Sequence, residues 1–241
     1  IDNIKDVVGV TSAKDAIVAP NVINTLIDYR SKKTRQKLYD KKPEYLPLYA
    51  DTIINERLHL FVDNSGLTNN MKRFVSKDFK LFMYNTHLFD YKNEMLFNYE
   101  NIHQQKPDST IHFFIPTKQY YSFLEKMDLN NSEYLYCFMY PEFIQTILND
   151  EILAIPSISN TPIEKWLQNV KKDFIGLTGL KNGLFYDILA ANAYSKQLLS
   201  NSKPLSEKQK ANIVNYFKNK SFIDILFKQN KYIIQQQELT V

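Results

Sequence analysis

Glycine is scarce in this sequence, with only five glycines among the 241 residues. A typical protein contains about 7% glycine. Sheets joined by tight turns depend on this residue, because it adopts positive φ without a steric cost. The chain is therefore expected to consist of helices joined by short connections. We predict an all-α fold of about eight or nine mostly antiparallel helices in an irregular bundle.

The spacing of apolar residues supports the same fold class. Phe, Met and Val recur every three or four residues over 69–99, which predicts the longest helix of the chain. The short apolar run 111–116 is the one candidate for an extended segment. The ranges expected to be helical are 20–39, 53–62, 69–99, 117–127, 132–149 and 161–175, followed by three short helices within 183–230.

Several polar residues and prolines predict where helices begin. Pro20 suits a first helical turn, because proline has no backbone N–H to leave unpaired there. Thr161 and Glu164 have the spacing of a capping box, in which each side chain accepts a hydrogen bond from the other residue's backbone. Ser206 with Gln209, and Ser221 with Asp224, predict the starts of the last two helices.

The composition excludes a disordered chain. Hydrophobic residues make up 44% of the sequence, with 16 Phe and 16 Tyr, which is enough to build a core. We expect a single helical domain over 1–241, with 1–110 and 111–241 as an alternative subdivision. The chain begins at Ile1 and not at Met, so we expect a fragment of a larger protein. No apolar run approaches the roughly 20 residues of a membrane span.

The net charge of +4 comes from one segment. Residues 30–42 contain seven basic residues and one acidic residue, a net +6, so the rest of the chain carries −2. Such a run forms either a hydrated face or a surface for an anionic partner. No aromatic stacking platform lies nearby, so we expect no nucleic-acid partner. The predicted interaction surface consists of Arg30, Lys32, Lys33, Arg35 and Lys37.

Two E-x-x-H pairs, Glu56–His59 and Glu100–His103, are the nearest approach to a metal site. Helical di-iron proteins use this spacing, together with a carboxylate from each of two further helices. Here Glu56 lies about 200° around its helix from the apolar residue Ile54, so it is expected to point away from the buried face. No inward-facing glutamates supply the other ligands. We therefore expect no metal, no cofactor and no catalytic residue.

Cysteine and tyrosine are both predicted to serve packing. Cys137 is the single cysteine and lies among aromatic residues, without the cationic setting that activates a thiolate. We expect it to be buried and inert. Tyrosines at helical spacing, such as Tyr120 and Tyr121, usually bury their rings in the core. The alternative is an aromatic-lined groove between helices that binds a peptide or a glycan.

Three blocks of sequence resemble a known family. They are YYSFLEKMDLNNSEYLYCFMYPEFIQTIL at 120–148, GLFYDILAANAYSKQL at 183–198 and PLSEKQKANIVNYFKNKSFIDILFKQNKYI at 204–233, with a fainter match in LPLYAD at 46–51. Together they resemble the helical region that precedes the thioredoxin domain in multidomain TlpA-like thiol–disulfide oxidoreductases of the bacterial envelope. Their motifs are patterns of packing residues.

The resemblance implies a role next to a redox domain and a location in the bacterial periplasm or cell envelope. In that family a thioredoxin domain with a W-C-x-x-C motif follows the helical region. Dithiol exchange requires an attacking and a resolving thiol. This chain has only Cys137, so it is expected not to be an enzyme as it stands. The resemblance implies a scaffold or interaction module that contacts a neighbouring thioredoxin-like domain or a protein client.

Overall fold

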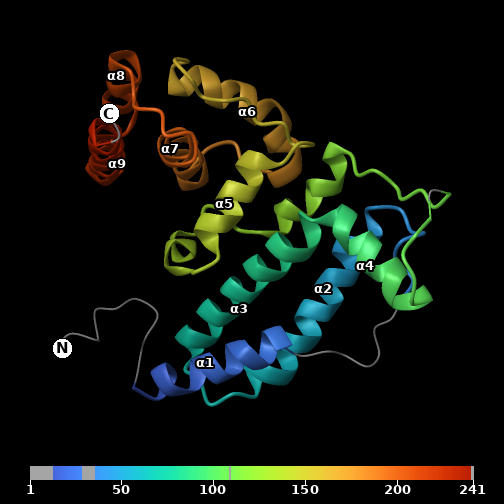
Figure 1. Cartoon of the computed structure of the whole chain (residues 1–241). Coiled ribbons are helices and arrows are strands. Elements are labelled where there is room, and N and C mark those ends of the chain that lie inside the picture. Colours follow the sequence, from blue (N-terminus) through green and yellow to red (C-terminus); the bar gives the residue numbers. More distant parts are fainter. Residues whose placement is uncertain (1–12, 29–35, 109, 240–241) are drawn as a thin grey trace. The chain divides into compact units, whose positions relative to one another are not determined.

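The computed structural model describes residues 13–28, 36–108 and 110–239. About 70% of the chain is helical and no strand occurs in these residues, which confirms the all-α prediction. The described residues form nine α-helices and four shorter π or 3₁₀ segments, somewhat more elements than the eight or nine expected (Figure 1). The elements are α1 Ala13–Asp28, α2 Tyr45–Arg57, η2 Leu58–Asp63, α3 Asn69–Met83, η3 Tyr84–Leu88, α4 Tyr91–His103, η4 Lys118–Lys126, η5 Ser132–Tyr136, α5 Tyr140–Asn149, α6 Ile163–Thr178, α7 Leu184–Leu199, α8 Glu207–Tyr216 and α9 Lys220–Glu238.

The chain divides into two compact units. Unit 1 comprises Ile1–Tyr120 and Ser132–Phe143, and unit 2 comprises Tyr121–Asn131 and Ile144–Val241. Each unit has its own set of buried apolar side chains. The single domain over 1–241, and its alternative boundary at residue 110, stay predictions.

Unit 1 is organised around α3, which packs against α1, α2 and η2 (Figure 1). Its core contains Tyr84, which is fully buried, and Phe79. A buried carboxylate joins α1 to the start of α3. Asp15 accepts hydrogen bonds from the Thr68 backbone N–H at 2.9 Å and from its hydroxyl at 2.7 Å. Thr68 in turn caps α3, so one polar contact positions two helices.

The prediction that a helix starts at Pro20 is wrong. Helix α1 begins at Ala13 and has Pro20 in its interior. An interior proline removes one helical hydrogen bond and crowds the preceding turn. Leu26 and Asp15, on either side of Pro20, are both fully buried. Packing of both halves of the helix therefore outweighs the local preference. Residues 29–35 of the predicted helix lie outside the described residues, and 36–39 are not helical.

The predicted long helix over 69–99 is interrupted. Helix α3 ends at Met83, a π segment follows, and α4 starts at Tyr91. The Phe89 N–H donates to the Tyr84 carbonyl at 3.1 Å, five residues back, which widens and under-winds the helix at this point. Asp90 then leaves helical geometry, with φ −103° and ψ 40°. The apolar spacing continues across the break because α3 and α4 both bury one face.

The segment before residue 120 also differs from expectation. Residues 111–117 form no strand, and no other described segment is a strand with which they could pair. The predicted α-helix over 117–127 is instead the 3₁₀ segment η4, Lys118–Lys126. Its apolar side chains are nevertheless buried as the spacing predicts: Tyr120, Tyr121, Phe123, Leu124 and Met127.

Unit 2 is built on α7, which packs against α9 and α6, while α6 also contacts α8 (Figure 1). Its core includes Trp166 at 1% exposure and Phe185 and Tyr194 at 0%. The largest side chains of the C-terminal half are therefore used for joining these four helices. This packing agrees with the amphipathic spacing of 183–230.

The predicted helix starts in unit 2 have mixed outcomes. The capping box of Ser206 and Gln209 is present at the start of α8. The box expected at Thr161 is absent, because α6 begins one residue later, after Pro162, and that N-cap has no side-chain hydrogen bond. Helix α9 is capped by Asn219, whose side chain accepts from the Ser221 N–H, so Ser221 is not the cap.

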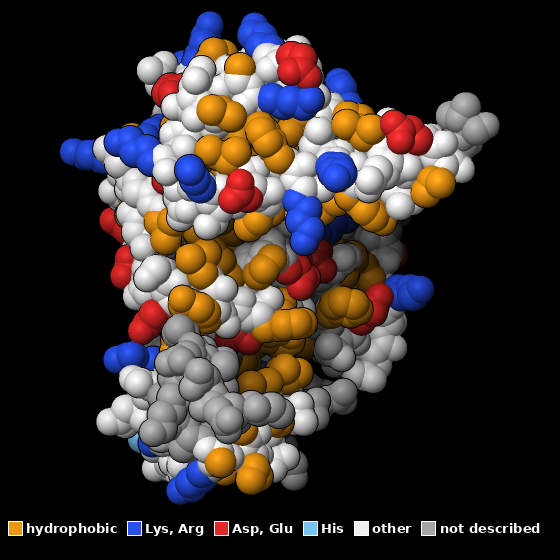
Figure 2. Space-filling model, turned by 90° about the vertical axis from the view of Figure 1, so that its left-hand side faces the viewer, with side chains coloured by type: hydrophobic (Ala, Val, Ile, Leu, Met, Phe, Trp, Pro, Cys, Tyr) orange, Lys and Arg blue, Asp and Glu red, His pale blue; other side chains and the backbone are white. Residues whose placement is uncertain are grey.

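None of the helices described here combines the length and the hydropathy that a bilayer crossing needs. Figure 2 shows one face of the molecule, on which hydrophobic side chains are interspersed with Lys, Arg, Asp and Glu. Charges of both signs are therefore mixed on that face.

Candidate functional site

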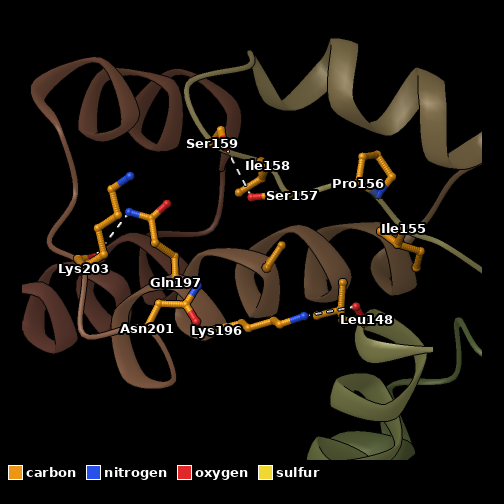
Figure 3. Close-up of a pocket in the computed structure, with 11 residues that line it drawn as sticks. Leu148, Ile155, Pro156, Ser157, Ile158, Ser159, Lys196, Gln197, Asn201 and Lys203 are labelled. Carbon is orange, nitrogen blue, oxygen red and sulfur yellow. Dashed lines mark hydrogen bonds between the residues drawn. The ribbon is translucent and has the colours of Figure 1, made fainter. Parts of the chain in front are cut away.

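A pocket of about 360 Å³ in unit 2 is the strongest candidate for a site (Figure 3). Its walls come from the end of α5, the loop after it, the last two turns of α7 and the loop that leads to α8. The lining residues are Leu148, Ile155, Pro156, Ser157, Ile158, Ser159, Ala193, Lys196, Gln197, Asn201 and Lys203. A volume of this size lies at the lower end of the range for small-ligand sites.

Two buried glutamines hold the walls together. The side-chain amides of Gln197 and Gln209 exchange hydrogen bonds at 2.7 and 3.1 Å, which ties α7 to the first turn of α8. The Gln209 amide also donates to the Ser159 carbonyl at 2.7 Å. The Gln197 amide lies 3.3 Å from the Lys203 carbonyl (Figure 3). One amide pair therefore fixes both loops that line the pocket.

Further hydrogen bonds hold the same loops in place. The Trp166 indole N–H donates to the Pro156 carbonyl at 2.7 Å. The Gln237 amide donates to the Ser202 carbonyl at 2.7 Å, and the Asn230 side chain accepts from the Leu205 N–H at 2.7 Å. Satisfied buried polar groups rigidify a structure. The pocket is therefore formed before any ligand arrives.

The lining chemistry suits binding. The pocket is lined by Lys196 and Lys203 but by no His, Cys, Asp or Glu. The Ser157 and Ser159 hydroxyls lie 3.3 Å apart and contact each other (Figure 3). Nucleophilic serines need an adjacent base that takes their proton. These residues supply hydrogen bonds, positive charge and apolar surface, which are the elements of recognition.

Cys137 lies in unit 1 and is buried, with 5% of its surface exposed. Its Sγ donates to the Glu133 carbonyl at 3.8 Å. Burial raises the pKa of the Cys137 thiol to about 12, and the charge of Asp78 adds to the effect. The thiolate, which is the reactive form, is therefore almost unpopulated at neutral pH.

The residues of the two E-x-x-H pairs have separate local partners. His59 lies in η2 and is exposed, with Nδ1 3.4 Å from an Asp63 carboxylate oxygen. His103 ends α4, where its Nε2 lies 2.7 Å from the Tyr39 hydroxyl and its ring stacks on Tyr99 at 4.4 Å. In the described ranges, no group of three or more His, Cys, Asp or Glu could hold a metal ion.

Of the predicted basic surface, only Lys37 lies in the described residues; Arg30, Lys32, Lys33 and Arg35 lie outside them. The Lys37 ammonium is 3.0 Å from an Asp40 carboxylate oxygen and 4.9 Å from the centre of the Tyr39 ring. The hydrogen bond with Asp40 raises the pKa of Lys37. The surface itself stays a prediction.

Asn130 joins two segments of unit 2 that are distant in the sequence. Asn130, from block 120–148, donates to the Asn182 carbonyl at 3.0 Å and accepts from the Phe185 N–H at 3.1 Å. It thereby satisfies a free N–H at the start of α7. Gly183 makes the approach feasible, because a Cβ there would lie 2.3 Å from the Asn130 side-chain oxygen.

Sequence reasoning identified Gln209 as a cap but did not find the pocket. The lining residues Ser159 and Ala193 are more than thirty residues apart in the sequence. No local pattern predicts that these two parts of the chain come together. The available signal is the polar side chain at a buried helical position: Gln197, Gln209 and Asn230 are all less than 9% exposed. Such residues predict an internal hydrogen-bond network.

Comparison of the chain with protein-family models, with curated proteins and with solved structures gave no match.

Proposed function

We propose that this chain is a non-catalytic helical scaffold and interaction module of a TlpA-like envelope thiol–disulfide oxidoreductase. In this role it adjoins a thioredoxin-like domain of the same polypeptide in the bacterial periplasm or cell envelope, and offers a surface to a protein client. The observation that carries the proposal is the state of its one thiol. Cys137 is buried and its pKa is raised to about 12.

This observation bears on function because thiol–disulfide exchange starts with an accessible thiolate and ends with a second thiol that resolves the mixed disulfide. Cys137 is the single cysteine of the chain and is not accessible. A redox role for this polypeptide would therefore belong to a neighbouring domain. Helices that position such a domain need only a well-packed core and a free surface.

The contact of Asn130 with Gly183 and Phe185 also supports the proposal. These residues belong to the LNN and GLF segments that carry the family resemblance. Asn130 fixes the start of α7 through two hydrogen bonds. The resemblance thus falls on residues with a definite structural task.

The second candidate is a stand-alone binding protein for a peptide. The pocket of unit 2 favours it, because two cations and an apolar floor surround a preformed cavity. A glycan is less well matched, since no aromatic side chain lines this pocket for stacking on a sugar. Among the described residues, nine tyrosines are buried in the two cores and are therefore not available to an aromatic groove.

Reduction of insulin by dithiothreitol tests the proposal. Addition of the chain is expected to leave the rate of insulin precipitation at that of dithiothreitol alone, while a thioredoxin accelerates it. The variant Cys137→Ser should behave as the unsubstituted chain does. Acceleration by the chain that disappears in Cys137→Ser would refute the proposal. Reading the gene beyond codon 241 adds a second test, since a W-C-x-x-C motif in frame is expected there.

A further inference from the structure

We infer that the pocket of unit 2 binds the free C-terminal carboxylate of a peptide that ends in an aliphatic residue. The inference rests on the proposed interaction role and names what the module recognises. Figure 3 shows the pocket between the end of α5, the loop 155–159 and the C-terminal turns of α7. Three features lead to this ligand: the charge of the lining, the apolar floor and the rigidity of the walls.

The charge of the lining selects an anion. Lys196 and Lys203 are its two charged residues, and neither forms an ion pair in the described part of the chain. The Lys196 ammonium donates to the Leu148 carbonyl at 3.3 Å. An ammonium has three donors, so two N–H groups remain for a ligand. Figure 3 shows the two side chains on different sides of the pocket, so the Lys196 ammonium would bind the carboxylate directly and Lys203 would add positive charge to the lining.

The C-terminal end of α7 repels an anion less strongly than a helix end with free carbonyl groups would. Free carbonyls at such an end carry partial negative charge. Here the Lys196 carbonyl accepts from the Ser200 N–H at 3.0 Å, and the Gln197 carbonyl accepts from the Lys203 N–H at 3.1 Å. The nearby carboxylate of Asp150 is likewise occupied by two backbone N–H groups and the Tyr121 hydroxyl.

The floor of the pocket selects an aliphatic group. Leu148, Ile158 and Ala193 line it with branched or small apolar side chains, and Leu148 and Ile158 are buried. Burial of such surface favours association. About 360 Å³ accommodates one or two amino-acid residues and not a folded segment. The end of a peptide chain fits this limit, because its carboxylate and its last side chain enter together.

The walls are rigid enough to discriminate. The Gln197–Gln209 amide pair and the Gln209 contact with the Ser159 carbonyl hold both loops in place. A preformed site avoids the ordering cost that a mobile loop would add to binding. The Ser157 hydroxyl and the exposed Asn201 amide lie at the rim. Their hydroxyl and amide are groups that can bond the last peptide group of the ligand.

Calorimetric titration of the full chain tests the inference with four ligands. The probes are acetyl-Ala-Ala-Leu with a free C-terminus, the same peptide as its C-terminal amide, acetyl-Ala-Ala-Asp amide, and pentanoate. We expect the free-acid peptide to bind at least ten-fold more tightly than each of the other three. Equal binding of the amide would overturn the role of the carboxylate. Equal binding of pentanoate would overturn the assignment to a peptide.

Variants locate the binding in the pocket. We expect Lys196→Gln and Lys203→Gln each to lower the affinity for the free-acid peptide at least five-fold. Ala193→Leu, which fills the floor, should abolish binding. Lys208→Gln is the matched control, because Lys208 is exposed on α8 and does not line the pocket. Unchanged affinity in both pocket lysine variants would overturn the inference. Such a failure would leave the insulin result, and with it the non-catalytic role, untouched.

Discussion

At the scale of single residues, Gly183 carries the most specific structural demand in unit 2. Its φ of 129° and ψ of −174° belong to a region that is essentially reserved for glycine. The Asn130 side chain occupies the space where a Cβ would lie. Both constraints serve one purpose, the cap on the start of α7. We expect other residues at this position to damage the packing of the two segments that Asn130 joins.

Gly183→Ala should lower the free energy of unfolding by about 2–4 kcal/mol, because it combines backbone strain with a steric clash. Urea unfolding followed by circular dichroism measures the change. Gly176→Ala is the matched control. Gly176 lies exposed within α6, and nothing lies within 4 Å of an added Cβ. That substitution should raise stability by about 0.5–1 kcal/mol. Equal effects of the two substitutions would contradict this account.

Residue burial was the most predictable property of the chain. The aromatic setting of Cys137 predicted its burial, and the spacing of Tyr120, Tyr121 and Phe123 predicted theirs. These predictions succeed because burial follows from side-chain chemistry and periodicity. The roles of Asn130 and Gln197 could not be predicted, because their partners are distant in the sequence. Asn130 bonds a backbone group more than fifty residues away, and Gln197 bonds a side chain twelve residues away.

At the scale of elements, helix α8 shows how a local signal and a tertiary contact combine. Gln209 closes the capping box by accepting from the Ser206 N–H at 3.0 Å. Its amide group also joins the Gln197 side chain and the Ser159 carbonyl. A single side chain therefore caps the helix and fixes two neighbouring segments.

Gln209→Ala should lower the free energy of unfolding by about 2–4 kcal/mol, because it removes a cap and leaves buried polar groups without partners. The control is Gln235→Ala on the exposed face of α9, with an expected change within about 0.5 kcal/mol. Chemical denaturation of both variants gives the comparison. A loss below about 0.5 kcal/mol in Gln209→Ala would show that the amide network contributes little.

Helix boundaries were predicted less well than helix content. The Ser206 start is correct because the capping box is a local contact. The expected start at Pro20 failed because buried residues on both sides extend α1 through the proline. The break at Asp90 was not visible because both α3 and α4 continue the same apolar spacing. Local patterns report which face is buried, while tertiary packing decides where each helix ends.

At the scale of the whole molecule, the buried tyrosines predict a response to alkaline pH. Burial raises the pKa of Tyr91 to about 12 and that of Tyr194 to about 12, above the usual value near 10. Their neutral forms are favoured by folding. Above about pH 10 the unfolded chain loses these protons while the folded chain keeps them. Stability should therefore fall as pH rises from about 10 to 12, by up to about 1.4 kcal/mol per pH unit for each group.

Urea unfolding at a series of pH values from 8 to 11 measures the slope of the free energy of unfolding against pH. Tyr91→Phe provides the control, because it keeps the ring and removes a hydroxyl that is buried without a partner in the described residues. The slope above pH 10 should be smaller in this variant, while stability at pH 8 should not fall. A slope that Tyr91→Phe leaves unchanged would show that Tyr91 does not contribute to it.

The described apolar and aromatic residues join helices and enclose Cys137, the single thiol of the chain, as the proposed role of a non-catalytic interaction module requires. Titration of Cys137 with 5,5′-dithiobis(2-nitrobenzoic acid) at pH 8 tests this claim most directly. The folded chain should release no thionitrobenzoate within minutes, and the chain in 6 M guanidinium chloride should release one equivalent at once. One equivalent released rapidly by the folded chain would contradict the account.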